Sequence, residues 1–278
     1  MFFGIIIFLI YHTNTHFLYV LATSLSDEAF VVSGKVTIYP IGFDLSAYEA
    51  ILSKADFWVG YKNTLVYTVV GVSMAMIMTI ACAYPLSKNY LPGRKFFTGM
   101  IVFTMFFGGG LIPRYLLIKS LGFRNTIWAI VIPGCISAFN MIILRSFLQS
   151  IPSELEDAAA VDGLNPIRTL IQIVLPLSKP ALATITLYYA VAEWNSWLGA
   201  FLYLDHKEMH PVTLFLRNIV NGAQTALQQG ASDTDELAQI AATVRSATII
   251  LVVTPILCVY PFIQKYFVKG VMLGSLKG

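Results

Sequence analysis

Long runs of apolar residues alternate along the chain with short segments that hold most of its charged side chains. Intervals without a charged residue cover 63–87, 96–113, 125–144 and 246–264, and they are 25, 18, 20 and 19 residues long. Two further segments are apolar. One precedes Asp27, and the other covers 181–204 and contains one acidic residue. A helix needs about 20 such residues to cross a bilayer. The pattern therefore predicts six spans, at about 2–24, 63–86, 96–118, 126–148, 181–204 and 245–267.

The composition agrees with a membrane protein. Of 278 residues, 57% are hydrophobic and 12% are charged, and the mean hydropathy is +0.72; soluble proteins have about 25% charged residues. Apolar runs of this length exceed the roughly 10-residue strands of a membrane barrel, and helices satisfy their own backbone in lipid. We therefore expect an all-α membrane protein that forms a single domain over 1–278.

Several classes of function are excluded by what the sequence lacks. The net charge of +3 arises from 18 basic and 15 acidic residues spread along the chain, so there is no basic field for nucleic acid. Cys82, Cys135 and Cys258 lie inside apolar runs without metal-ligand spacing. The sequence contains no phosphate-binding glycine loop of the Walker type and no nucleophile elbow. We expect no catalytic site, no metal site and no cofactor bound by this chain.

A charged segment, ELEDAAAVDGLNPIRTLIQIVLPLSKP at 154–180, separates two of the predicted spans. Ser153 and Glu156 have the spacing of a capping box, and the alanines that follow favour a helix. Gly163 and then Asn165 before a proline provide a stop and a restart. We predict two short helices joined by a bend and lying parallel to the membrane plane.

The small side chains of this segment are suited to docking rather than catalysis. Ala158 and Ala159 predict a face that another surface could approach closely, unless the segment is an ordinary amphipathic loop. The order Asp157-Ala158-Ala159, Gly163 and Ile173-Val174-Leu175-Pro176 resembles the EAA loop of binding-protein-dependent ABC importer permeases. One departure is that Asp157 stands where that pattern has Glu, with Glu156 beside it.

The resemblance implies a cytoplasmic coupling helix, within a loop at 150–180, that sits in a cleft of a separate ATPase subunit. The residues that it assigns to this coupling are Glu156, Asp157, Ala158, Ala159, Asp162, Gly163, Asn165 and Pro176.

The resemblance covers nearly the whole chain. The stretches NTLVYTVVG at Asn63, LGFRNTIWAIVIPG at Leu121, AVAEWNSW at Ala190 and FVKGVMLGSLKG at Phe267 are similar to the six-span, maltose-type branch for carbohydrate uptake. The stretch GGGLIPRYLLIKSLG at Gly108 is similar to the subgroup associated with complex oligosaccharides.

This resemblance implies the type I ABC importer permease fold, in a multi-pass, non-catalytic subunit of the bacterial plasma (inner) membrane. The implied partners are a second permease subunit in a heterodimer, two ATPase subunits that hold ATP and Mg, and an extracytoplasmic sugar-binding protein. Two alternatives stay open: a permease of an ABC importer for a non-sugar solute, and a secondary transporter. The latter is expected to contain internal repeats, which this sequence does not show.

Glu193 is the candidate for a substrate pathway, because a charge inside a span is costly unless it faces protein or water. Aromatic and amide side chains around it are what the apolar face and the hydroxyl rim of a sugar require. Helical spacing places Tyr189, Glu193 and Trp197 on one face. The alternative is that the polar residues join helices and the aromatic ones mark the membrane interface. The predicted pathway residues are Glu193, Trp194, Asn195, Trp197, Tyr189, Asn140 and Gly109.

Overall fold

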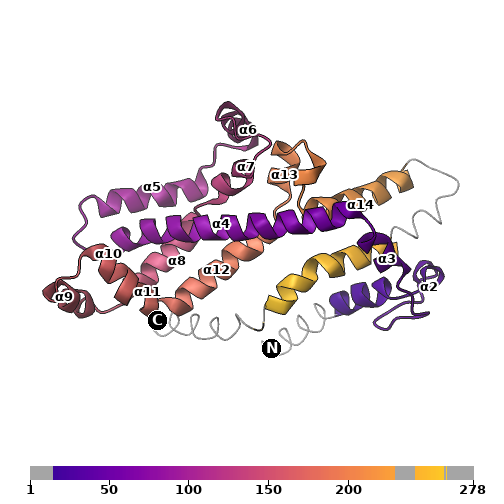
Figure 1. The fold of residues 1–278 in the computed structure, drawn as a ribbon, viewed down its shortest axis with the longest axis horizontal. Coiled ribbons are helices and arrows are strands. Elements are labelled where there is room, and N and C mark those ends of the chain that lie inside the picture. Colours follow the sequence, from indigo (N-terminus) through magenta and orange to yellow (C-terminus); the bar gives the residue numbers. More distant parts are fainter. Residues whose placement is uncertain (1–14, 229–241, 260, 262–278) are drawn as a thin grey trace. The chain divides into compact units, whose positions relative to one another are not determined.

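The structure, a computed structural model, describes residues 15–228, 242–259 and 261. Within these ranges the chain is helical, with one isolated bridge between Ser26 and Phe43 and no strand (Figure 1). The described residues form two compact units, the first within Met1–Thr64 and His206–Cys258, the second within Leu65–Asp205 and Val259–Gly278. Helix α4 (Ala55–Ser87) contributes to both units. The expectation of a single domain over 1–278 stays a prediction.

The first unit is built around the start of α4. Its other helices are 15–24, α2 (Glu28–Val32), α3 (Ser46–Leu52), η3 (Lys207–Met209), α14 (Val212–Gln228) and Ala242–Val259. Phe57 and Val212 are at most 1% exposed in the core of this unit. Gly60 lets the two helices approach, because a Cβ there would lie 3.1 Å from the Val212 nitrogen. The Val212 N–H donates to Thr64 Oγ1 at 2.8 Å, which fixes the start of α14 against α4.

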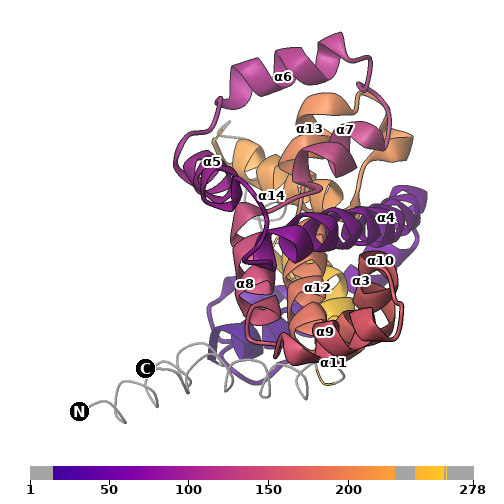
Figure 2. The same ribbon diagram turned by 90° about the vertical axis from the view of Figure 1, so that its left-hand side faces the viewer.

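The second unit packs the rest of α4 against two other helices. Its elements are α5 (Arg94–Phe106), α6 (Leu111–Ser120), α7 (Trp128–Val131), η1 (Ile132–Gly134), α8 (Ala138–Leu148), α9 (Glu154–Val161), α10 (Pro166–Thr169), η2 (Leu170–Val174), α11 (Leu175–Leu177), α12 (Lys179–Trp194) and α13 (Leu198–Tyr203). Figure 2 shows α8 and α12 side by side beneath α4. Ala75 and Ala83 of α4 are fully buried in this core, together with Met141, Leu144 and Ile185. Small residues on one helix therefore admit larger ones from its neighbours.

The described helices overlap the predicted spans, and several of them are short or bent. Two are long and apolar enough to cross a membrane unbroken, α4 with 33 residues and Ala242–Val259 with 18. Three other pairs of helices are long and apolar enough only when the two helices of a pair are taken together. These pairs bend by 112° between α5 and α6, 48° between η1 and α8, and 84° between α11 and α12. If each pair is one span, the described part of the chain holds up to five. The predicted first span, 2–24, and the end of the last, 245–267, lie partly outside the described residues.

Two of the predicted spans are not single continuous helices in the structure. The span 96–118 is broken after Phe106, because Phe107 is extended and Gly110 takes φ +79°, a left-handed value that favours glycine. The span 181–204 is broken between Trp194 and Leu198. Irregular backbone at membrane depth is tolerated where it lines a cavity or packs against protein.

Candidate functional site

The charged segment forms the predicted pair of short helices, α9 and α10, and then returns through η2 and α11 to α12. Gly163 adopts φ +77° two residues after the end of α9, a value that favours a residue without Cβ at this turn. Asn165 caps α10, with its Oδ1 accepting from the Arg168 N–H at 2.9 Å, and Pro166 occupies the first helical position. The stop and restart are confirmed. η2 is a π-helical turn, which the sequence analysis did not predict.

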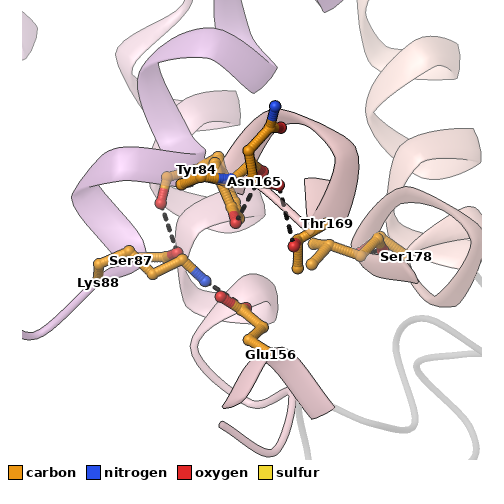
Figure 3. A network of polar contacts seen from close by, with 9 residues as sticks. Tyr84, Ser87, Lys88, Glu156, Asn165, Thr169 and Ser178 are labelled. Carbon is orange, nitrogen blue, oxygen red and sulfur yellow. Dashed lines mark hydrogen bonds and ion pairs between the residues drawn. The ribbon is translucent and has the colours of Figure 1, made fainter. Parts of the chain in front are cut away.

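The predicted capping box at the start of α9 is wrong. Ser153 has helical dihedral angles, φ −65° and ψ −26°, and its side chain makes no capping hydrogen bond. Glu156 instead reaches α4 and forms an ion pair with Lys88, as Figure 3 shows. A charged partner directly after the end of α4 thus replaces the local backbone contact.

This ion pair is the centre of a polar network between the end of α4 and the 150–180 loop. The side chains of Lys88 and Glu156 are only 12% and 19% exposed, and the Lys88 Nζ lies 4.3 Å from the centroid of the Tyr84 ring. The Tyr84 hydroxyl donates to the Pro166 carbonyl at 3.4 Å, and Ser87 Oγ donates to the Tyr84 carbonyl at 2.6 Å (Figure 3). Both short helices of the loop are therefore attached to α4.

The outer face of the loop differs from the predicted small-residue face. Ala158 is exposed, but Ala159 is 2% exposed and packs inward. Consecutive helical residues lie about 100° apart, so the two cannot share one face. The exposed surface instead carries Asp157 beside apolar Val161 and Ile167, which are 89% and 68% exposed. Among the other predicted coupling residues, the exposed ones are Asp162, Gly163, Asn165 and Pro176.

A cavity of about 730 Å³ lies in the second unit. It is bordered by the α5–α6 break, by α7 and η1, by the start of α8, by the end of α12 and by α13. Its polar lining consists of Arg114, Ser137, Asn140, Tyr189, Glu193, Ser196 and Tyr203. A volume of this size is typical of a ligand-binding site.

Tyr189 holds the bend beside this cavity. Its hydroxyl accepts from the Ser137 N–H at 2.9 Å and shares a 2.7 Å hydrogen bond with Thr79 Oγ1 of α4. Ser137 in turn caps α8 through the Asn140 N–H at 3.4 Å. Because Tyr189 is only 4% exposed, its ring packs in the core while its hydroxyl joins three helices. This contact fixes the bend between η1 and α8.

Glu193 sits against two glycines from other helices. A Cβ at Gly134 would lie 3.0 Å from Glu193 Oε1, and a Cβ at Gly71 of α4 would lie 3.1 Å from Glu193 Cδ. Neither position could accept a side chain without a shift of the carboxyl group. The two glycines therefore form a cradle that lets a carboxyl group from α12 reach the cavity wall.

A clasp of polar contacts joins the loop before α7 to the residue that follows α13. Arg124 Nη2 donates to Asp205 Oδ1 at 2.7 Å, and Asn125 Nδ2 donates to Asp205 Oδ2 at 2.9 Å. The Asp205 N–H donates back to Asn125 Oδ1 at 2.7 Å. The hydrogen bond and negative charge of Asp205 raise the pKa of Arg124. Asn125 adopts φ +58°, which Asn tolerates better than most residues.

Three of the predicted pathway residues, Asn140, Tyr189 and Glu193, line the cavity. The other four, Trp194, Asn195, Trp197 and Gly109, are not among the lining residues, although Gly108 and Gly110 are. The expected common face of Tyr189, Glu193 and Trp197 is wrong, because α12 ends at Trp194 and Trp197 lies beyond it.

Each of the other residues near that break has a different environment. Trp194 is buried, and Trp197 packs on Phe201 with ring centroids 6.2 Å apart. Asn195 ends α12, with its side-chain amide donating to the Val191 carbonyl at 2.8 Å.

Sequence reasoning missed four polar lining residues, Arg114, Ser137, Ser196 and Tyr203. For Arg114 a signal was present, since the three glycines at 108–110 predict irregular backbone next to a cavity or protein.

Comparison with known proteins places the chain in a family. Residues 57–273 match the family described as "Binding-protein-dependent transport system inner membrane component". The chain is 42% identical over 265 residues to the polygalacturonan/rhamnogalacturonan transport system permease protein YtcP of Bacillus subtilis, covering 94% of this chain and 92% of that protein. It is 38% identical over 266 residues to protein LplC of the same species, covering 94% and 88%.

A solved structure has the same fold. It is the crystal structure of a bacterial ABC transporter involved in the import of the acidic polysaccharide alginate, with a TM-score of 0.82, 34% sequence identity and 96% of both chains covered. The predicted type I importer permease fold is thereby confirmed. Helices of spanning length, the loop at 150–180 and a match over most of the sequence agree: the chain belongs to the inner membrane components of binding-protein-dependent transport systems, and it is a permease subunit.

Proposed function

We propose that this chain is the permease subunit of an ATP-driven importer that moves an oligosaccharide through the cavity at Glu193. The observation that carries the proposal is that cavity, of about 730 Å³, with hydroxyl, amide, carboxyl and guanidinium groups on its wall. Sugars present many hydroxyl groups, which require donors and acceptors at several positions. The relatives support a carbohydrate, since one is named for polygalacturonan and rhamnogalacturonan and the solved neighbour for alginate.

ATP is hydrolysed, in this proposal, by two separate ATPase subunits that bind ATP and Mg and dock on the 150–180 loop. The exposed Asp157, Val161 and Ile167 offer one carboxylate and two apolar side chains for such a contact. Movement of the loop reaches α4 through Lys88 and Glu156, and the bundle alternates between inward-open and outward-open states. A second permease subunit completes the pathway, and an extracytoplasmic binding protein delivers the sugar.

The test is reconstitution of this chain in proteoliposomes with its copurified partner subunits and binding protein. We expect ATP-dependent uptake of a labelled oligosaccharide and ATP hydrolysis that the loaded binding protein stimulates. Uptake of amino acids or phosphate in place of sugars would identify an importer for another solute. Uptake that follows an ion gradient and needs no ATPase chain would contradict the proposal altogether.

A further inference from the structure

Arg114 reaches the cavity because the α5–α6 connection bends sharply. The two helices meet at 112°, and the three glycines between them, at 108–110, carry no side chains. A Cβ at Gly108 would meet nothing within 4 Å, so the backbone here borders open space. The bend places Gly108, Gly110, Leu111 and Arg114 together on one wall of the cavity.

The positive charge of Arg114 is not offset within the described part of the chain. Among the described residues that line the cavity, Arg114 is the one basic side chain, and Glu193 is the one acidic side chain. The two do not form an ion pair, since the ion pairs in the described ranges are Lys88 with Glu156 and Arg124 with Asp205. No hydrogen bond of the Arg114 guanidinium is found there either. The lining of the cavity thus includes an exposed guanidinium with five N–H donors and a full positive charge.

We infer that the cavity takes an oligosaccharide that carries a carboxylate, as uronic acids do, and that Arg114 binds this group. The inference rests on the proposed function and names the substrate class of that same cavity. A guanidinium offers two parallel N–H groups that match the two oxygens of a carboxylate, and it stays charged at all physiological pH values.

Glu193 fixes the direction in which such a substrate lies. Its carboxyl group accepts hydrogen bonds from sugar hydroxyls but repels a second carboxylate when ionised. The acidic group of the substrate is therefore directed to Arg114, and its hydroxyl groups are directed to Glu193, Asn140 and Ser137. A basic and an acidic side chain in the lining that do not pair with each other give the cavity a preferred substrate orientation.

The experiment uses the complete importer in proteoliposomes with its binding protein. Uptake is measured against concentration for a uronic acid trisaccharide and for the same trisaccharide with its carboxylates methyl-esterified. Each value is divided by that of the wild type, so that selection by the binding protein cancels. Arg114→Gln should lower the apparent affinity for the acid about ten- to a hundredfold and change that for the ester less than twofold.

Lys119→Gln is the matched control, because it removes the same charge from α6 at an exposed position that does not line the cavity. It should leave both substrates unchanged. Arg114→Lys keeps the positive charge but lacks the two parallel N–H groups of the guanidinium, so it should retain part of the preference for the acid. If the Arg114→Gln importer does not assemble, the Arg114→Lys variant provides the comparison with the wild type.

Several results would overturn the assignment. These are equal losses for acid and ester, equal losses in Arg114→Gln and Lys119→Gln, or an Arg114→Lys importer without any preference for the acid. A wild-type importer that carries neutral oligosaccharides and excludes uronates overturns it while leaving the proposed function intact. A wild-type importer that carries no oligosaccharide at all refutes the proposed function, and this inference with it.

Discussion

Replacing Glu156 by Gln removes the negative partner of Lys88 while keeping the size of the side chain. Exposed ion pairs contribute about 0–1 kcal/mol, and breaking a fully buried pair costs about 3–5 kcal/mol. With exposures of 12% and 19%, and with the Lys88 ammonium also over the Tyr84 ring, this pair lies between those limits. We expect a loss of about 2 kcal/mol in the free energy of unfolding, which is roughly a thirtyfold change in the equilibrium constant.

A double-mutant cycle of Glu156→Gln, Lys88→Met and the double variant isolates the interaction between the two side chains. The measurement is the denaturant dependence of unfolding of the detergent-solubilised importer, together with the ratio of sugar transported to ATP hydrolysed. Loosening the tie to α4 should lower that ratio while the ATPase subunits stay bound. Asp157→Asn is the matched control: this carboxylate is exposed, so its loss should weaken ATPase association and leave unfolding unchanged. A coupling energy near zero, or the reverse pattern in the two variants, would refute the reasoning.

Three further predictions concern the loop, the cavity and the clasp. Gly163→Ala should cost about 1 kcal/mol through its φ of +77° alone, since its Cβ meets nothing within 4 Å, whereas Gly163→Trp should also release the ATPase in a pull-down and abolish uptake. Glu193→Ala should lower the apparent affinity for substrate about ten- to a hundredfold, and Glu193→Gln less, with assembly and basal ATP hydrolysis retained; failure to assemble would make Glu193 a packing residue. Asn125→Gly keeps the φ of +58° accessible but removes both side-chain contacts with Asp205, and should lower the thermal midpoint, by about 1 kcal/mol in stability; an unchanged midpoint would show that the clasp is idle.

Hydropathy predicted the membrane helices because it measures composition, and composition is local. The 25 uncharged residues after Lys62 lie in one helix, α4. Its buried small residues, Ala75 and Ala83, are explained by the helices that pack against them, which hydropathy does not describe. The bend at Ser137 was not predicted, although Pro133 and Gly134 stand just before it, and its hydrogen bond from the Ser137 N–H to Tyr189 joins residues 52 positions apart. The end of α12 at Trp194 was missed although its contact is local, since the Asn195 side chain donates to the Val191 carbonyl four residues earlier.

The loop shows the same division between local and distant causes. Gly163 and Asn165 act on their own backbone, so their roles could be predicted from sequence. The direction of Glu156 was decided by Lys88, 68 positions earlier, and a motif of adjacent residues contains no information about that partner. Arg114 was missed because charge was read as a boundary of a span rather than as part of a cavity wall.

The glycine cradle has a consequence for how the sequence can drift over evolution. While position 193 holds a carboxyl group, alanine at position 134 or 71 would force that group to shift by a few tenths of an ångström, so both positions are restricted even toward the smallest side chain. Gly108 and Gly109, whose added Cβ atoms meet nothing within 4 Å, carry no such restriction on space. Among descendants of this gene, the three positions should therefore vary as a linked set. A lineage that loses the acid at 193 becomes free to acquire side chains at 71 and 134, and thereafter cannot easily regain it.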